Sequence, residues 1–471
     1  MSQPVTATIR MYRLDDELGD CFLLNFADSG TAVRVLLDCG SFTNSTRART
    51  RLLRIAGDIE AELQGSGLDV VIGTHQHNDH VSGFLHCEPV FRRIGIDQVW
   101  LSWLDDPNDR QAQAIGRDYN NLRNNLAAAR SALSALARRN RPAVVRTLAV
   151  MNDVLGFFGA RTTNTPPTTP ADAVKILEDI GTQRPRYLEP GRTFDLPGLP
   201  ADTVRVHVLG PPRNEKLLYR KDPRSGESYD HTLTAVSAMV TKFLAAAGQA
   251  RTARDEAHYP FNEQYKRRSP KAGSKALADV GRAYHRRAAD WRRIDDAWIQ
   301  QGERLALWLD GYTNNSSLVL AFELVRSAKV LLFVADAQTG NWLSWDDVRW
   351  QSPGVTTDDL LARTVFYKVG HHASHNATLI AQFEKMNHPD LAALIPVHKK
   401  DSNITKPNGW KMPARNLFER IVEKTDHRVL QMDGVNPPTC NPESNPAKAA
   451  WRRAGVTPKL TARFVELRIQ G

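Results

Sequence analysis

Two kinds of hydrophobic pattern alternate along the chain. Short runs rich in β-branched and aliphatic residues predict strands, because such residues suit a pleated surface that is buried on one or both faces. These predicted strands are 8–14, 21–26, 32–37, 68–74, 98–103, 203–209, 317–322, 329–335, 364–369, 391–397, 429–432 and 460–469. Longer segments with apolar residues three or four positions apart predict helices at 47–63, 122–136, 171–180 and 414–424. Strands and helices that alternate in this way favour an α/β sandwich with a partly parallel sheet and helices on the outside.

Two segments interrupt this alternation. The first contains a helix with leucines on one face and arginines on the others, followed by the Pro/Thr-rich linker TTNTPPTTP at 162–170. The second is basic and mainly helical in pattern. The predicted organisation is a first half of the sandwich at 1–106, an insertion with the linker at 107–200, a core strand at 201–212, a second insertion at 213–304 and a second half of the sandwich at 305–471.

Composition narrows the class of protein. The chain has 471 residues, of which 41% are hydrophobic and 24% charged, as is ordinary for a globular protein. Its four cysteines form no CxxC pair and are too few for a dense disulfide scaffold. The N-terminus lacks a signal-peptide pattern, and no apolar run approaches the roughly 20 residues that span a bilayer. We therefore expect a soluble, cytoplasmic protein with no membrane association.

Positive charge is concentrated in the two insertions. The net charge of the chain is +10, while residues 107–146 alone carry +6 and residues 251–304 carry +5. Localised positive charge favours a polyanionic partner such as nucleic acid, through steering and counterion release. Arginines that simply keep a helix soluble explain the same composition.

The strongest chemical signal is the heptapeptide THQHNDH at 74–80, directly after the predicted strand at 68–74. It places His75, His77, Asp79 and His80 within six residues. Imidazole and carboxylate groups bind zinc, and also iron or manganese. On a loop that leaves a strand, His75 and His77 can point to one side while Asp79 and His80 reach a second ion.

This HxHxDH pattern after a short hydrophobic strand resembles the signature of the metallo-β-lactamase fold superfamily. Three further segments resemble its other motifs in the same order: LLDCG at 36–40, LLFVAD at 331–336 and KVGHHASH at 368–375. Within the superfamily, the chain is most similar to the hydrolase domain of competence-type DNA-uptake proteins, through GDC at 19–21, NNSSLVL at 314–320 and HHAS at 371–374. The resemblance covers about 8–105 and 203–435, and both basic insertions lie outside it.

The resemblance implies an αββα sandwich with one or two Zn²⁺ ions, or Mn²⁺ or Mg²⁺ in their place. The implied metal ligands are His75, His77, Asp79, His80, Asp336 and His371. The implied catalytic residues are Asp79, His372 and Asp38. Asp38 would hydrogen-bond a ligand histidine and fix its tautomer, or else cap the end of its strand. His372 would support the ligands or transfer protons, and an exchange of roles between His371 and His372 stays open.

The sequence departs from the superfamily pattern at the first metal site. Many members supply a third histidine just before the strand predicted at 317–322, where this chain has Thr313, Asn314 and Asn315. His207 and His231 are the remaining candidates to fill this gap, although each is better explained as a structural or surface residue. The missing histidine predicts a weaker first site, or one that prefers Mn²⁺ or Mg²⁺.

The expected activity is hydrolysis by a metal-activated water. No GxSxG nucleophile motif and no Walker loop is present. The basic insertions favour a phosphodiesterase or nuclease that acts on nucleic acid. A hydrolase of small esters, thioesters, lactones or amides is the alternative, because fold does not dictate substrate. A nucleic-acid-binding module without catalysis is the third hypothesis. The sequence does not identify which proteins, if any, bind this chain.

Overall fold

The computed structural model describes residues 4–137, 142–158, 169–220, 309–407 and 409–471, together with isolated positions between 279 and 306. Most of the Pro/Thr-rich linker, most of the second predicted insertion and His231 lie outside the described residues.

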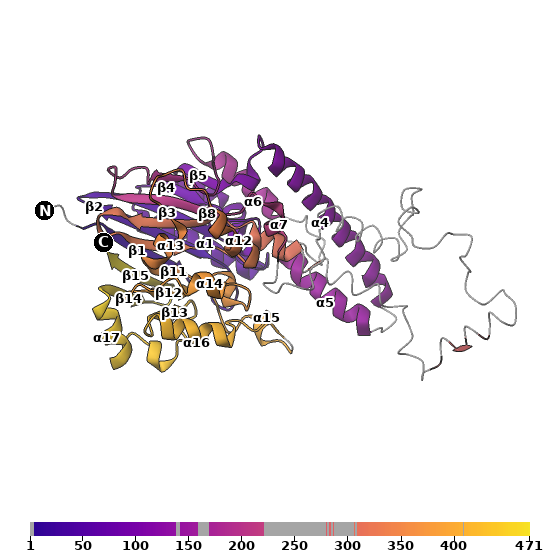
Figure 1. Ribbon diagram of the computed structural model, residues 1–471. Helices are drawn as coiled ribbons and strands as arrows, with labels where there is room; N and C mark the ends of the chain where they lie inside the picture. The colour runs from indigo at the N-terminus through magenta and orange to yellow at the C-terminus, as the bar shows by residue number, and fades with distance from the viewer. Residues whose placement is uncertain are drawn as a thin grey trace. The chain divides into compact units, whose positions relative to one another are not determined.

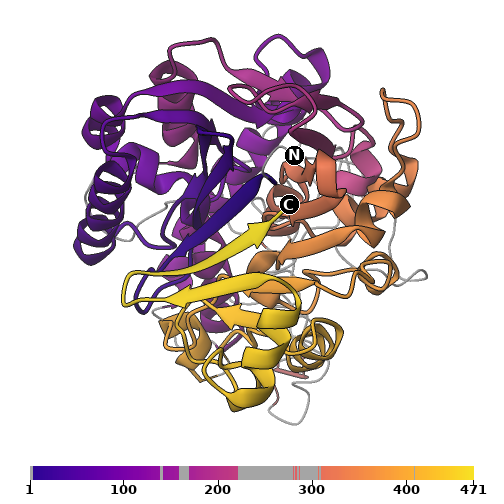
Figure 2. The ribbon, with the colours of Figure 1, turned by 90° about the vertical axis from the view of Figure 1, so that its left-hand side faces the viewer.

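The described residues form two mixed β-sheets, and the first has eight strands. In spatial order these are β14 (Val456–Leu460), β15 (Phe464–Gln470), β1 (Thr6–Tyr12), β2 (Cys21–Asp28), β3 (Thr31–Cys39), β4 (Leu68–Ile72), β5 (Ile96–Ser102) and β6 (Arg186–Leu188). The strands from β14 to β3 pair antiparallel, and those from β3 to β6 pair parallel. Figure 2 shows β15, in yellow, running beside β1, in indigo.

The second sheet has seven strands and the same plan. In spatial order these are β13 (Val429–Gln431), β12 (Ala392–Ile395), β11 (Thr364–Lys368), β10 (Lys329–Phe333), β9 (Val319–Leu324), β8 (Val204–Gly210) and β7 (Thr193–Asp195). The strands from β10 to β13 pair parallel, and those from β7 to β10 pair antiparallel. Each sheet therefore has one parallel half, which places the carboxyl ends of several strands at one edge.

The two sheets pack face to face through aromatic side chains. Phe26 stacks on Phe322 with ring centroids 5.3 Å apart, and the ring of Phe22 meets Phe333 edge-on at 6.2 Å. Along β10, Leu331 and Phe333 face this inner core, while Val330 and Leu332 face a second apolar cluster on the other side. A strand buried on both faces requires a further layer, which the helices provide. The prediction of an α/β sandwich is confirmed at this level.

Helices cover both outer faces of the sheets (Figure 1). On the first sheet they are α1 (Thr46–Leu63), α2 (Asn78–His86), α3 (Glu88–Ile94), α6 (Pro170–Ile180) and α17 (Asn445–Arg453). The second sheet carries α12 (Thr339–Ser344), α13 (Thr357–Ala362), α14 (Ile380–Phe383) and α16 (Arg415–Lys424). The remaining short helices are α7 (Glu215–Leu218) and α15 (Ser402–Thr405). No helix in the described part of the chain is long and apolar enough to cross a membrane.

The chain divides into two compact units. The first comprises 1–114, 156–227 and 311–471 and contains both sheets. The second comprises 115–155 and 228–310, of which the structure describes most of α4 (Arg110–Ala137) and α5 (Pro142–Phe157). These boundaries differ from the predicted insertion at 107–200, because α6, β6 and β7 within that segment belong to the first unit. Three-residue strands such as β6 and β7 are too short to produce a recognisable pattern.

Candidate metal centre

The predicted site residues lie at the carboxyl ends of four strands. Asp38 is the penultimate residue of β3, and the HQH segment follows β4. Asp336 follows β10, and the two neighbouring histidines at 371 and 372 follow β11. Because β3 pairs parallel with β4, and β10 with β11, each pair delivers its side chains to one edge of its sheet.

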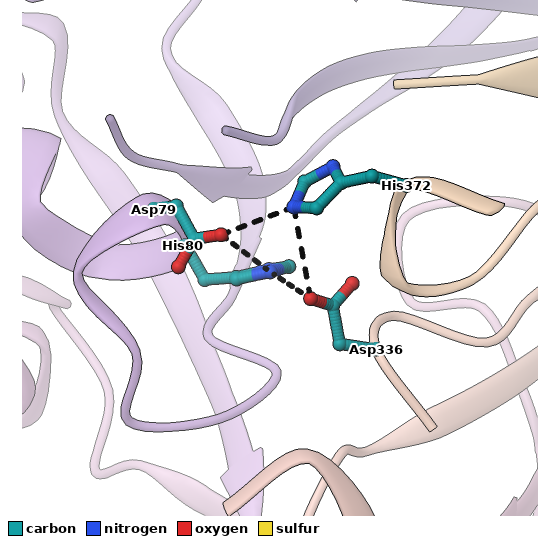
Figure 3. A group of neighbouring side chains, drawn as sticks. All are labelled: Asp79, His80, Asp336 and His372. Carbon is teal, nitrogen blue, oxygen red and sulfur yellow. Dashed lines mark hydrogen bonds and ion pairs between the residues drawn. The ribbon is translucent and has the colours of Figure 1, made fainter. Parts of the chain in front are cut away.

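Four of these residues form a compact buried cluster. Asp79, His80, Asp336 and His372 each offer one ligand atom, and these atoms all lie within 4.8 Å of one another. His372 Nε2 lies 3.1 Å from Asp79 Oδ2, and His80 Nε2 lies 3.1 Å from Asp336 Oδ2. Figure 3 shows the four side chains pointing toward a common centre, two from α2 and two from the segments that follow β10 and β11. All four are fully buried.

The structure corrects the prediction that Asp79 and His80 lie on a loop. Both belong to the first turn of α2, which begins at Asn78. Asn78 anchors this turn by donating hydrogen bonds from Nδ2 to the carbonyl oxygens of Ser41 and Phe42. A helix directly after the HQH segment gives Asp79 and His80 a rigid support.

Hydrogen bonds on the far side of each ring orient the two histidines. His80 Nδ1 lies 2.8 Å from Asp38 Oδ2, so Nε2 faces the cluster. His372 Nδ1 donates to the carbonyl oxygen of Pro396 at 2.6 Å, which again leaves Nε2 facing inward. Asp38 is itself held by the backbone N–H and the hydroxyl of Thr74, at 2.9 and 2.7 Å. Asp38 therefore accepts the expected hydrogen bond from a histidine, while the role of His80 as a metal ligand stays a prediction.

The donor atoms of the cluster fit a divalent cation. Asp79 Oδ1, His80 Nε2 and Asp336 Oδ2 are buried and make no hydrogen bond to any described residue. Buried polar atoms without partners are costly, and several of them in one place point to a missing ligand. Two imidazole nitrogens and two carboxylates are a donor set that Zn²⁺ and Mn²⁺ accept.

The electrostatics of the cluster favour positive charge. Burial opposes ionisation of Asp336 and Asp79, but it is outweighed by His80 and His372 together, with Lys368 acting on Asp336 as well. The pKa of both carboxyls is therefore lowered, that of Asp336 far below its usual value. Burial likewise disfavours a charged His372, yet Asp336 and Asp79 raise its pKa to about 9. The carboxylates therefore stabilise a cation at this position, whether it is a protonated ring or a metal ion.

His75 and His77 form a pair beside the cluster. His75 Nε2 lies 3.1 Å from His77 Nδ1, and the ring of His75 is 4.1 Å from that of His80. The hydroxyls of Thr74 and Ser317 lie 3.1 and 3.3 Å from His75 Nδ1. Burial lowers the pKa of both histidines, that of His77 to about 3, so both rings are neutral. Neither joins the four-residue cluster, although both adjoin it.

The missing third histidine of this first site is not supplied by His207. That residue lies on β8, where its Nε2 is 2.8 Å from Glu323 Oε2 and its Nδ1 is 3.1 Å from the hydroxyl of Thr193. Asn314, at the expected place in the sequence, is buried with its Nδ2 3.5 Å from His371 Nε2.

The structure places His372 in the cluster, where the sequence favoured His371. The backbone N–H of His371 donates to Asp336 Oδ1 at 3.0 Å, and its ring lies against Ser374 and Gln338. Residues 371, 372 and 373 all have positive φ, between 41° and 60°. This left-handed turn carries the second histidine inward, which a sequence motif alone does not reveal.

Two site residues were missed by sequence reasoning. Asp20 and Lys368 are fully buried, with Lys368 Nζ 2.5 Å from Asp20 Oδ2 and 3.4 Å from Asp336 Oδ1. Burial opposes charge on Lys368, but Asp20 and Asp336 outweigh it and raise its pKa. Both residues lie inside motifs that carried the resemblance, GDC and KVGHHASH, and their position in those motifs was the available signal.

Comparisons with protein-family models and with curated proteins find no match to this chain. The geometry of the cluster is therefore the principal evidence on function.

Proposed function

We propose that the protein is a metal-dependent hydrolase of the metallo-β-lactamase type that cleaves phosphodiester bonds, with nucleic acid as the substrate. The buried cluster of Asp79, His80, Asp336 and His372 carries this proposal. Its residues come from the motifs, in the order, that the superfamily resemblance predicts. The arrangement of two facing mixed sheets with helices outside agrees with that type of fold.

Asp79, His80, Asp336 and His372 would hold a divalent ion, which would supply a Lewis acid and lower the pKa of a bound water to about 7. The protein's contribution is to fix the ligand atoms before the substrate arrives. Asp38 and the Pro396 carbonyl orient the two imidazoles, and the His371 N–H orients Asp336. Because the cluster is buried, electrostatic interactions within it are stronger than they would be in water.

The choice of a phosphodiester rests on charge. Positive charge on a protein attracts an anionic substrate, and residues 107–146 carry eight arginines and two aspartates. Helix α4 buries Ile115, Tyr119, Leu122 and Leu126 along one face, while Arg117 on another face is exposed. Arg117 is therefore available to a polyanion in solution, and Arg123 and Arg130 of the same helix are partly exposed.

The test begins with the metal content of the purified protein by elemental analysis. Cleavage of labelled single- and double-stranded DNA, RNA and a bis-aryl phosphodiester is then measured with Zn²⁺, Mn²⁺ and Mg²⁺. We expect at least one ion per chain and cleavage of one of these substrates. Asp336→Asn and Asp79→Asn should each abolish cleavage while the circular dichroism spectrum is unchanged.

Three results would contradict parts of this proposal. Bound metal without cleavage of any phosphodiester would retain the metallo-hydrolase and redirect the search to small esters, thioesters, lactones and amides. Salt-sensitive DNA binding without turnover in any metal would favour a binding module. Full activity of Asp336→Asn would show that the site is misassigned.

A further inference from the structure

A second group of potential ligands adjoins the first. Asp20, Asp38 and His80 are buried, and one ligand atom of each lies within 4.8 Å of the others. His80 belongs to both groups, since Nδ1 faces Asp38 while Nε2 faces Asp336. Two carboxylates buried this closely repel each other unless a cation lies between or beside them.

The ammonium of Lys368 lies at this second group. Its Nζ is 2.5 Å from Asp20 Oδ2, 2.7 Å from the carbonyl oxygen of Ala335 and 3.4 Å from Asp336 Oδ1. Lys368 is the last residue of β11, and its side chain is fully buried. Three oxygen atoms around one nitrogen are a set that a small metal ion would also accept.

The two carboxylate oxygens of Asp336 have different partners, and the ammonium of Lys368 lies near only one of them. Oδ1 lies near Lys368 Nζ and accepts the backbone N–H of His371 at 3.0 Å. Oδ2 is left facing His80 and His372, at 3.1 and 3.9 Å from their Nε2 atoms. The contacts of Oδ1 with Lys368 and the His371 N–H therefore fix the orientation of the Asp336 carboxylate.

We propose that Lys368 is a built-in cation between Asp20 of the second group and Asp336 of the first, and a positioning residue for Asp336. Its ammonium occupies the place that a divalent ion would take among Asp20, Asp336 and the Ala335 carbonyl. Divalent ions are thereby confined to the side of His80 and Asp336 that faces Asp79 and His372. The inference rests on the proposed metal centre but not on the identity of the substrate.

The proposal is tested with Lys368→Met, which retains most of the volume of the side chain and removes only the ammonium. Mn²⁺ binding to the full chain is measured by equilibrium titration and by the electron paramagnetic resonance of bound Mn²⁺. We expect one additional Mn²⁺ per chain relative to the wild type, with a spectrum broadened by a neighbouring ion. The double variant Lys368→Met/Asp20→Asn should lose this additional ion, because its carboxylate is gone.

The matched control is Lys329→Met, on the adjacent strand β10, where the lysine binds the Gln470 carbonyl at the surface. This variant should bind the same number of ions as the wild type. An unchanged number of ions in Lys368→Met would overturn the proposal. If Lys368→Met does not fold in a chelator, Mn²⁺ should restore its fold, and failure to do so would equally overturn the proposal.

The outcomes for the lysine and for the proposed function are separate. Wild-type protein that binds no Mn²⁺, Zn²⁺ or Mg²⁺ contradicts the metal centre itself. Wild-type protein that binds ions, with no gain in Lys368→Met, leaves the hydrolase intact and rejects only the role of Lys368.

Discussion

In each histidine of the cluster, the ring nitrogen that points away from the cluster makes the hydrogen bond that orients the ring. Asp38 holds His80, and the Pro396 carbonyl holds His372, so both present Nε2 without rearrangement. The two acceptors differ in charge, because one is a carboxylate and the other a backbone carbonyl. A carboxylate partner makes an imidazole a stronger metal ligand, so we expect His80 to bind the proposed ion more strongly than His372 does.

The first residue-scale prediction separates the neighbouring histidines. His372→Ala removes an inward-facing nitrogen and should weaken metal affinity by more than tenfold in a chelator competition assay. His371→Ala retains the backbone N–H that holds Asp336 and should weaken it by much less. The reverse order of effects would restore His371 as the ligand.

The second residue-scale prediction concerns Glu323, which accepts hydrogen bonds from His207 and Arg363 at 2.8 and 2.7 Å. The hydrogen bond from His207, with that from Arg363, lowers the pKa of Glu323 to about 2 although burial opposes this. The pKa of Glu323 is lower in the folded state than in the unfolded state. Ionised Glu323 therefore stabilises the folded protein above pH 4.5, and this stabilisation is lost as the pH falls toward 2.

Urea unfolding at pH 7, 4 and 3 checks this prediction. Glu323→Gln should be less stable than the wild type at pH 7, and the difference should shrink toward pH 3. The exposed Glu443→Gln is the control and should match the wild type throughout. A constant difference for Glu323→Gln at all three values would contradict the assignment.

At the scale of elements, the site depends on how closely α2 approaches the end of β3. A Cβ added to Gly83 of α2 would lie 2.5 Å from both the carbonyl oxygen and the Sγ of Cys39. A Cβ added to Gly40 would lie 2.3 Å from the backbone of Asp79 and His80. These two glycines allow the two backbones to touch, and this close approach brings Asp79 and His80 to Asp38.

Gly83→Ala should therefore destabilise the fold by about 1–3 kcal/mol and weaken metal affinity, because the helix must move away from β3. Gly57→Ala in α1 is the control, since its added Cβ has no atom within 4 Å apart from its chain neighbours and the adjoining backbone of its own helix. That variant should stabilise the protein by up to about 1 kcal/mol. Denaturant unfolding measures the stability of each variant, and chelator competition measures its metal affinity. If Gly83→Ala and Gly57→Ala changed both quantities equally, the site would not depend on the close approach of α2 to β3.

At the scale of the whole molecule, the sequence predicted the elements with strong patterns. The strands at 21–26 and 364–369 and the helix at 47–63 match β2, β11 and α1 closely, since each carries a long apolar stripe. It missed α2, because the polar HQHNDH segment hides the start of a helix whose apolar face is short. It missed the role of Lys368, because a buried lysine depends on carboxylates that only tertiary structure brings near.

The charge distribution gives a prediction at the same scale. Reversing Arg117, Arg123 and Arg130 to glutamate should weaken affinity for DNA and reduce the steepness of its salt dependence. For every phosphate that these arginines no longer neutralise, the slope should fall by about 0.9. Binding is measured between 50 and 200 mM salt, and an unchanged slope would assign these arginines to solubility alone.

The wide separation in sequence between Asp79 and His372 has a consequence for biosynthesis. The two residues are 293 positions apart. At a translation rate of about 5–20 residues per second, roughly 15–60 s pass between their emergence from the ribosome. Until Asp336 emerges, the nascent chain displays HQHNDH with only two of the four side chains of the cluster, Asp79 and His80. The proposed metal centre therefore lacks at least one of its four side chains until His372 has emerged, and a chain stalled before β11 should compete poorly for the ion.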